Sequence, residues 1–178
     1  MKIIRYVLLA FAATAMLSLA AYGQTRKPVK RTTATPKTAA TLPPLDVRAA
    51  RLTVSNQLAN VTRFVSLLGP IGQAIEALDA EAKVKKLKKE SLDKNAADKQ
   101  TVIVTIRNLR QGMVKLESDF RVKPALKKYL PTIQGISTLA GQAEDSAVAG
   151  KFVVANTPLR SIQQKLTDTL AAMPKADL

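Results

Sequence analysis

The chain has 178 residues, of which 28 are Lys or Arg and 13 are Asp or Glu, so its formal net charge is +15. It contains no His, no Cys and no Trp. These absences exclude an imidazole base, thiol nucleophiles, disulfides, His-bound haem and metal sites built from His or thiolate ligands. The sequence shows no phosphate-binding loop and no catalytic motif. The composition therefore indicates a non-catalytic protein without a cofactor or metal.

The N-terminus has the three parts of an export signal. Lys2 and Arg5 give a positive start, and residues 7–20 form an apolar run of 14 residues. Small residues then occupy positions −3 and −1 of a cleavage site after Gly23, which is typical of a secretory signal peptide. An uncleaved anchor is disfavoured because a membrane span takes about 20 residues. We therefore expect residues 1–23 to be removed, leaving a secreted or periplasmic protein with no membrane span.

The next segment, residues 24–45, is predicted to be a disordered basic linker. It contains six Thr, four Pro and five Lys or Arg, with no acidic residue. Repeated Pro blocks helix propagation, and few side chains are available to build a core. The segment is either a solvated spacer or a cationic arm that holds the protein near an anionic envelope polymer or lipid headgroups.

The remainder, residues 46–178, has the apolar periodicity of α-helices. Apolar residues recur at alternating spacings of four and three, which places them along one seam of a helix, as in coiled coils. No sustained period-two alternation predicts a strand. The predicted seams consist of Val54, Leu58, Val61, Val65 and Leu68; Ile71, Ile75, Leu78 and Ala82; Val102, Ile106, Leu109, Met113, Leu116 and Phe120; Leu126, Tyr129, Ile133, Ile136, Ala140, Ala143 and Ala147; and Ala155, Leu159, Ile162, Leu166 and Met173, with Thr169 or Leu170 between the last two.

Helix-breaking residues separate these seams. Asp46 is expected to cap the first helix and Gly69-Pro70 to end it, while the polar residues 91–95 separate the second helix from the third. Short connections make neighbouring helices antiparallel. The prediction is an all-α protein: an antiparallel up-and-down bundle of four to five long helices, with stacked α-hairpins as the alternative.

Further breaks are expected in the second half of the chain. Lys123-Pro124 should separate the third helix from the fourth, Pro131 should bend or split the fourth, and Gly150 should mark its last turn. The last helix starts either at Thr157-Pro158, with Pro at the first helical position, or at Lys151 with a kink at Pro158.

Two basic regions are candidate anion-binding surfaces. In the lysine-rich stretch 83–94, several lysines have an acidic residue four positions away, which favours a self-paired helix. Lys88 and Lys89 have no such partner. A second region spans a helix end and the next helix start. The candidate residues are Lys88, Lys89, Arg107, Arg110, Arg121, Lys123, Lys127 and Lys128.

Nucleic acid is not the expected partner. After signal removal, the aromatic residues outside the linker are Phe64, Phe120, Tyr129 and Phe152, and two of these lie on apolar seams. The sequence therefore offers no evident platform for base stacking.

Acidic residues were weighed as candidate catalytic groups. Glu76 and Asp79 are three residues apart and share a helix face, so their carboxylates can meet. Asp79 also has Lys83 one turn further on, which favours a structural role. The other acidic pairs are Glu117 with Asp119 and Glu144 with Asp145.

One stretch resembles a known repeat. Ala143, Ala147, Gly150-Lys151-Phe152, Ala155, Leu159 and Ile162 are similar to a tetratricopeptide-type hairpin, in which small residues pack two antiparallel helices around a Gly-aromatic turn. The resemblance covers about 20 residues, has no second copy at the repeat period and is interrupted by Pro158. It implies a protein-interaction module. The seam formed by Ala140, Ala143 and Ala147 either packs helices closely or leaves a groove for a partner helix.

These observations predict an exported, non-catalytic helical bundle that binds or scaffolds at the bacterial envelope through a basic surface. The expected partner is an anionic envelope polymer or lipid headgroup. The alternatives are a helical-hairpin module with a protein partner and, least favoured, an enzyme that uses carboxylates alone.

Overall fold

The computed structural model describes residues 43–175, and within these residues the chain forms helices and no strand. The predicted signal peptide and nearly all of the predicted linker lie outside them. The elements are α2 (Leu45–Val84), α3 (Lys89–Val122), the 3-10 helix η2 (Pro124–Tyr129), α4 (Leu130–Ile133), α5 (Ile136–Val148) and α6 (Phe152–Ala172).

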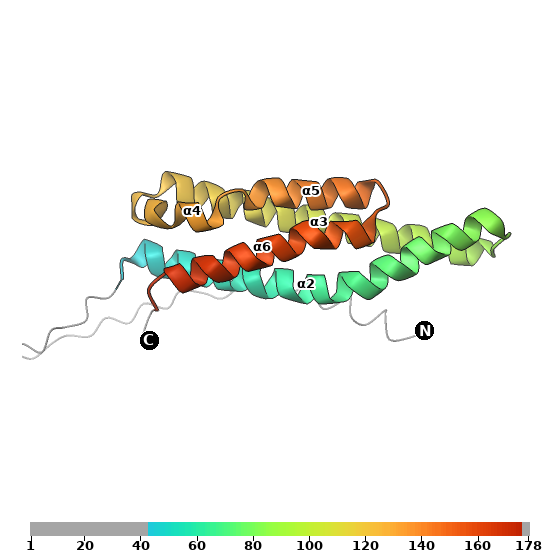
Figure 1. Ribbon diagram of the computed structural model, residues 1–178, viewed down its shortest axis with the longest axis horizontal. Helices are drawn as coiled ribbons and strands as arrows, with labels where there is room; N and C mark the ends of the chain where they lie inside the picture. The colour runs from blue at the N-terminus through green and yellow to red at the C-terminus, as the bar shows by residue number, and fades with distance from the viewer. Residues whose placement is uncertain (1–42, 176–178) are drawn as a thin grey trace, which may run out of the picture. The chain divides into compact units, whose positions relative to one another are not determined.

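The helices are arranged up and down. α2 and α3 form a long antiparallel pair, η2 and α4 turn the chain at the end of α3, α5 runs back along α3, and α6 returns along α2 (Figure 1). α6 also packs on α5, which closes the four-sided bundle. The predicted all-α antiparallel bundle is confirmed.

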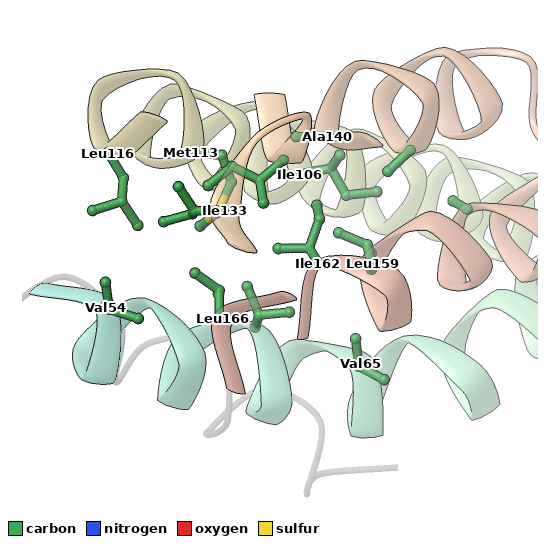
Figure 2. Close-up of a cluster of buried hydrophobic side chains, with 14 of the residues drawn as sticks. Val54, Val65, Ile106, Met113, Leu116, Ile133, Ala140, Leu159, Ile162 and Leu166 are labelled. Carbon is green, nitrogen blue, oxygen red and sulfur yellow. The ribbon is translucent and has the colours of Figure 1, made fainter. Parts of the chain in front are cut away.

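The core is built from the predicted seams. Side chains from α2, α3, α6 and the α4–α5 region meet along the axis of the bundle (Figure 2). The predicted seam positions from Leu126 to Ala147 are all buried, and at the last step of α6 Thr169 is the buried residue while Leu170 is partly buried. One expectation is wrong, since Ala82 is exposed. The 4-3 spacing therefore predicts the buried faces of α2, α3, the η2–α4–α5 segment and α6.

The predicted end of the first helix at Gly69-Pro70 is wrong, because α2 continues through both residues for 40 residues in all. The buried seam of α2 continues past this point through Leu68, Gly72 and Ile75. The Pro70 ring is exposed, so the proline costs a backbone hydrogen bond without disturbing the core. The packing of buried residues before and after Gly69-Pro70 outweighs the tendency of these two residues to end a helix. α2 changes direction past its midpoint (Figure 1), as expected for a helix with an internal proline.

The start of α2 also differs from the expectation. Pro44 occupies the N-cap position, and no side chain caps this end. Asp46 lies one residue inside the helix, in the first turn, where its negative charge still favours the helix dipole.

The predicted break at residues 91–95 is wrong as well. α2 ends at Val84, the chain turns over residues 85–88, and α3 already starts at Lys89. A helix continued through this stretch would stack like charges, with Lys85 and Lys89 four residues apart. Lys85 pairs with Glu81, four residues before it, with Nζ and Oε1 3.2 Å apart. Lys86 and Glu90 have the same spacing, but the turn interrupts the helix that their pairing would need.

The α2–α3 pair projects beyond the α5–α6 turn (Figure 1). We refer to this projection, residues 77–100, as the arm. Its inner seam is polar: the Asp79 carboxylate accepts hydrogen bonds from Asn95 Nδ2 at 2.7 Å and from Lys99 Nζ at 2.5 Å. Asp79 is therefore bonded to α3 rather than to Lys83, its expected partner.

The remaining breaks agree with the sequence. α3 ends before Lys123-Pro124, and Pro124 opens η2. The predicted fourth helix, which contains Pro131, is split into η2, α4 and α5. The break before α5 is at Gly135, whose φ is 90°. Gly150, with φ 74°, forms the α5–α6 turn. α6 starts directly after Lys151 and includes Pro158, which was one of the two alternatives.

The close crossing of α2 and α6 favours a glycine at position 72. A Cβ atom there would lie 3.1 Å from Phe152 Cβ, 3.2 Å from Phe152 C and 3.3 Å from Val153 N, in the first turn of α6. Backbone atoms cannot move aside without separating the helices. At Gly141, inside α5, the nearest atom to such a Cβ is Arg110 Nε at 3.9 Å, which is an ordinary contact.

We therefore predict opposite effects for two Gly→Ala substitutions. Gly72→Ala should lower the free energy of unfolding by about 1–3 kcal/mol through overpacking. Gly141→Ala should raise it by up to about 1 kcal/mol, because Ala is the better helix former. Urea denaturation followed by circular dichroism measures both. If the two substitutions changed the free energy of unfolding equally, or if their effects were reversed, the close α2–α6 crossing would be contradicted.

Candidate functional site

The structure does not gather the eight candidate cations into one surface. They fall into three groups along α3 and its flanks: Lys88 and Lys89 at the start of α3, Arg107 and Arg110 midway, and Arg121, Lys123, Lys127 and Lys128 at its end and on η2. A helix of 34 residues is about 50 Å long. The first and last groups therefore lie at opposite ends of the molecule's described part.

The middle pair of arginines holds a carboxylate of α5. Arg107 Nε donates to Glu144 Oε1 at 2.9 Å, and Arg110 Nη1 donates to Glu144 Oε2 at 2.8 Å. The Glu144 side chain is only 10% exposed. The hydrogen bonds from Arg110 and Arg107 lower the pKa of Glu144, so it stays ionised at neutral pH. These arginines therefore connect α3 to α5.

An open groove of about 560 Å³ lies beside this ion pair. It is lined by Arg107, Arg110, Gln111, Val114, Lys115, Ser118, Asp119 and Glu144. Of its cations, two are bonded to Glu144, and Lys115 pairs with Asp119 at 3.2 Å. The positive charge of this groove is thus largely balanced by its own carboxylates.

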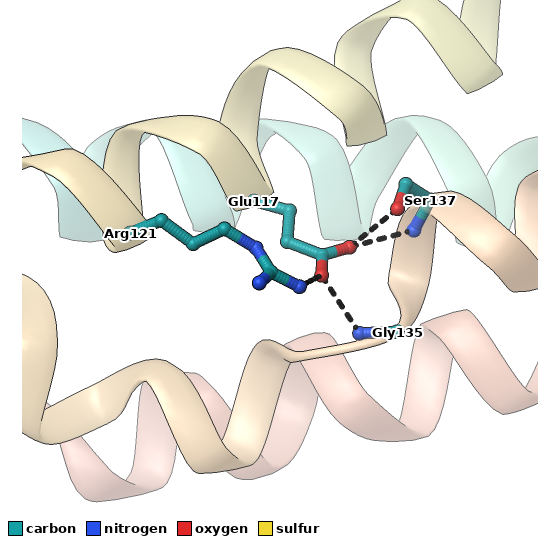
Figure 3. Close-up of polar contacts among 4 residues, drawn as sticks. All are labelled: Glu117, Arg121, Gly135 and Ser137. Carbon is teal, nitrogen blue, oxygen red and sulfur yellow. Dashed lines mark hydrogen bonds and ion pairs between the residues drawn. The ribbon is translucent and has the colours of Figure 1, made fainter.

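Arg121 is also held by a buried carboxylate, that of Glu117. The Glu117 side chain is 4% exposed, and its Oε1 accepts from Arg121 Nη2 at 2.5 Å and from Gly135 N–H at 3.1 Å. Its Oε2 accepts from the Ser137 N–H at 3.0 Å and from the Ser137 hydroxyl at 2.6 Å (Figure 3). Glu117 of α3 therefore caps the N-terminus of α5, whose own N-cap residue, Gly135, has no side chain to do so.

The surroundings of Glu117 favour its ionised form. Burial alone would raise the pKa of this carboxyl group. The four hydrogen bonds that it accepts outweigh burial and lower the pKa from 4.5 to about 2. The positive end of the α5 dipole acts in the same direction. Glu117 is a structural anchor that stays negative at neutral pH.

Both ends of α6 are capped in the same way, by side chains of α2. The Glu76 carboxylate accepts from Val153 N–H at 2.8 Å, in the first turn of α6. At the other end, Arg51 Nη1 donates to the carbonyl oxygens of Leu170 at 2.6 Å and Met173 at 2.9 Å. The proposed catalytic pair is thus divided, because Glu76 binds α6 while Asp79 binds α3.

The end of α3 and η2 carries four of the eight candidate cations. We refer to this surface, made of Arg121, Val122, Lys123, Lys127 and Lys128, as the η2 end. Lys123 lies 4.0 Å from Asp119, and Lys128 Nζ lies 4.9 Å from the centroid of the Tyr129 ring. Among the described residues, Lys127 and Lys128 are exposed and make no ion pair with an acid. Val122 between the charges is 72% exposed.

A second groove, of about 430 Å³, adjoins the η2 end. It is lined by Pro43, Pro44, Val47, Pro124, Ala125, Lys128, Tyr129 and Pro174. Pro43, the first described residue, therefore lies at this end.

The α5–α6 hairpin has the packing that the tetratricopeptide resemblance implies. Ala143, Ala147 and Ala155 are fully buried, and Phe152 is 1% exposed. The alanine seam of α5 is therefore filled by α3 and α6 and is not an open groove for a partner helix.

No family model, curated protein or solved structure matches this chain. Within residues 43–175, no group of acidic side chains is arranged to hold a metal ion. No helix in this range is long and apolar enough to cross a bilayer.

We predict that Glu117→Gln lowers the free energy of unfolding by about 3 kcal/mol at pH 7, because one charged acceptor of four hydrogen bonds is lost. The folded-state pKa lies below the unfolded one, so this stabilisation is complete above pH 4.5 and disappears as the pH falls towards 2. The difference between wild type and variant should shrink over that interval in urea titrations.

Asp119→Asn is the matched control, since Asp119 is on the same helix and its ion pairs are with exposed lysines. It should cost less than about 1 kcal/mol. A Glu117→Gln effect as small as this, or one that does not depend on pH, would contradict the capping role of Glu117.

Proposed function

We propose that this protein is an exported, non-catalytic helical bundle that attaches to anionic material of the bacterial envelope through the η2 end. The ligand chemistry is a surface or polymer that carries phosphate or carboxylate groups. The export signal and the basic linker in the sequence support this proposal, as does the net charge of +13 (26 Lys or Arg against 13 Asp or Glu) that remains without residues 1–23.

The proposal rests on one observation: some candidate cations are bound to buried carboxylates, whereas others are exposed and have no acidic partner within residues 43–175. Arg107, Arg110 and Arg121 are bound to buried carboxylates and hold helices together. Lys127 and Lys128 are exposed on η2 and have no acidic partner among the described residues. They are therefore available for an external anion.

The described part of the chain begins at the same end. Pro43 and Pro44, which follow the basic segment, line one groove with Lys128 and Tyr129. The five Lys or Arg of residues 24–42 precede Pro43 in the sequence and add to the positive charge of the exported protein. Several cations near one anionic surface attract it by about 1 kcal/mol each, an attraction that salt weakens.

We predict that the processed protein cosediments with vesicles containing anionic lipid and with purified cell wall at about 50 mM NaCl, and is released at about 500 mM. Lys127→Glu combined with Lys128→Glu should reduce the partition coefficient at least about tenfold, because two attractive charges become repulsive.

The charge-matched control is Lys151→Glu combined with Arg160→Glu, two exposed cations of α6 and its N-cap. It changes the net charge equally and should reduce binding much less. Equal losses in the two double variants would show that net charge alone is responsible, and no binding at low salt would refute the proposal.

A further inference from the structure

The tip of the arm carries a second concentration of positive charge. We refer to residues 83–89 as the tip. Its five lysines, Lys83, Lys85, Lys86, Lys88 and Lys89, are all exposed. Lys85 pairs with Glu81, and no acidic partner is found for the other four within the described residues. Because the arm projects beyond the α5–α6 turn (Figure 1), those helices do not cover the tip.

Lys83 and Lys85 lie at the C-terminal end of α2, where cations suit the helix dipole, but Lys88 and Lys89 do not serve the stability of the arm. Lys88 and Lys89 stand at the N-terminus of α3, where the helix dipole is already positive and acidic residues are favoured. Lys85 and Lys86 stand beside them in the turn, so like charges are close together. A cluster that weakens local folding is explained better by an external anion than by the fold.

An exposed valine lies among the cations at each end of α3. Val84 at the tip is 79% exposed, and Val122 at the η2 end is 72% exposed. Cations beside an exposed apolar side chain suit a bilayer interface, where lysines contact headgroup phosphates and the apolar group enters the boundary of the acyl chains. A soluble anionic polymer offers no such apolar layer, so the combination favours an anionic lipid bilayer.

The two surfaces lie at opposite ends of α3. α3 starts at the tip and ends beside η2, so about 50 Å of helix separates Lys89 from Val122. One bilayer cannot easily contact both ends of a rod that stands upright on it. We propose that the protein joins two anionic bilayer surfaces, one held by the η2 end and the other by the tip. This inference rests on the proposed function of the η2 end.

The test is vesicle clustering. The processed protein is mixed with vesicles of phosphatidylglycerol and phosphatidylcholine, and particle size is followed by dynamic light scattering while cosedimentation records binding. Wild type should bind and cluster the vesicles. Lys88→Glu combined with Lys89→Glu should still bind through the η2 end, yet its clustering should fall at least about fivefold.

Controls separate the alternatives. Since acids at the start of α3 favour the helix dipole, the tip variant should unfold at the same or a higher temperature than wild type, so lost clustering cannot be ascribed to unfolding. The variant with Lys151→Glu and Arg160→Glu should bind and cluster. Val84→Ser should reduce clustering while leaving binding to purified cell wall unchanged.

The outcomes are distinguishable. If wild type binds vesicles without clustering them, the inference is wrong and the proposed function stands. If the tip variant clusters vesicles as well as wild type, the second contact lies elsewhere, for example in self-association. If wild type does not bind anionic vesicles or cell wall at all, the proposed function itself fails.

Discussion

The ends of the shorter helices depend on side chains from the longer ones. None of the described α-helices has a side-chain hydrogen bond from its own N-cap residue. Glu117 of α3 binds the start of α5, while Glu76 and Arg51 of α2 bind the two ends of α6. Unsatisfied amides and carbonyls inside a bundle are costly, so each bond fixes the position of one helix along its neighbour. The α2–α3 pair thus sets the register of the whole bundle.

This use of carboxylates also determines which cations remain for a ligand. The buried Glu117 and Glu144 each need positive partners, and three arginines of α3 supply them. Arginine suits this role because its guanidinium group donates several hydrogen bonds in a fixed geometry. Among the described residues, Lys127 and Lys128 on η2 and four lysines of the tip keep exposed side chains without an acidic partner, as do cations elsewhere such as Lys94, Lys151 and Arg160. The division between structural arginines and free lysines is the basis of the proposed function.

The seams could be predicted because helical periodicity is a local property of the sequence, whereas helix ends depend on packing. Gly69-Pro70 has the residues of a helix end, but α6 packs across Gly72 and keeps α2 intact. The candidate site shows the same limit of prediction from the sequence. Glu117 lies four residues after the buried Met113, and Glu144 four after the buried Ala140, so both positions could have been recognised as inward-facing. Of the partners of Glu117, only Arg121, four residues further on the same helix, could be predicted. Gly135 and Ser137 could not, because they lie 18 and 20 residues further along the chain.

The arm follows from unequal helix lengths. α2 and α3 have 40 and 34 residues, whereas α5 and α6 have 13 and 21, so the long pair must extend past the short one. Where α5 and α6 no longer cover it, the apolar seam gives way to polar residues, and Asn95 and Lys99 of α3 both donate to Asp79 of α2. An apolar seam there would expose a hydrophobic surface to solvent. The polar seam lets two helices project without a cover, and it places the charged tip at the greatest distance from the η2 end.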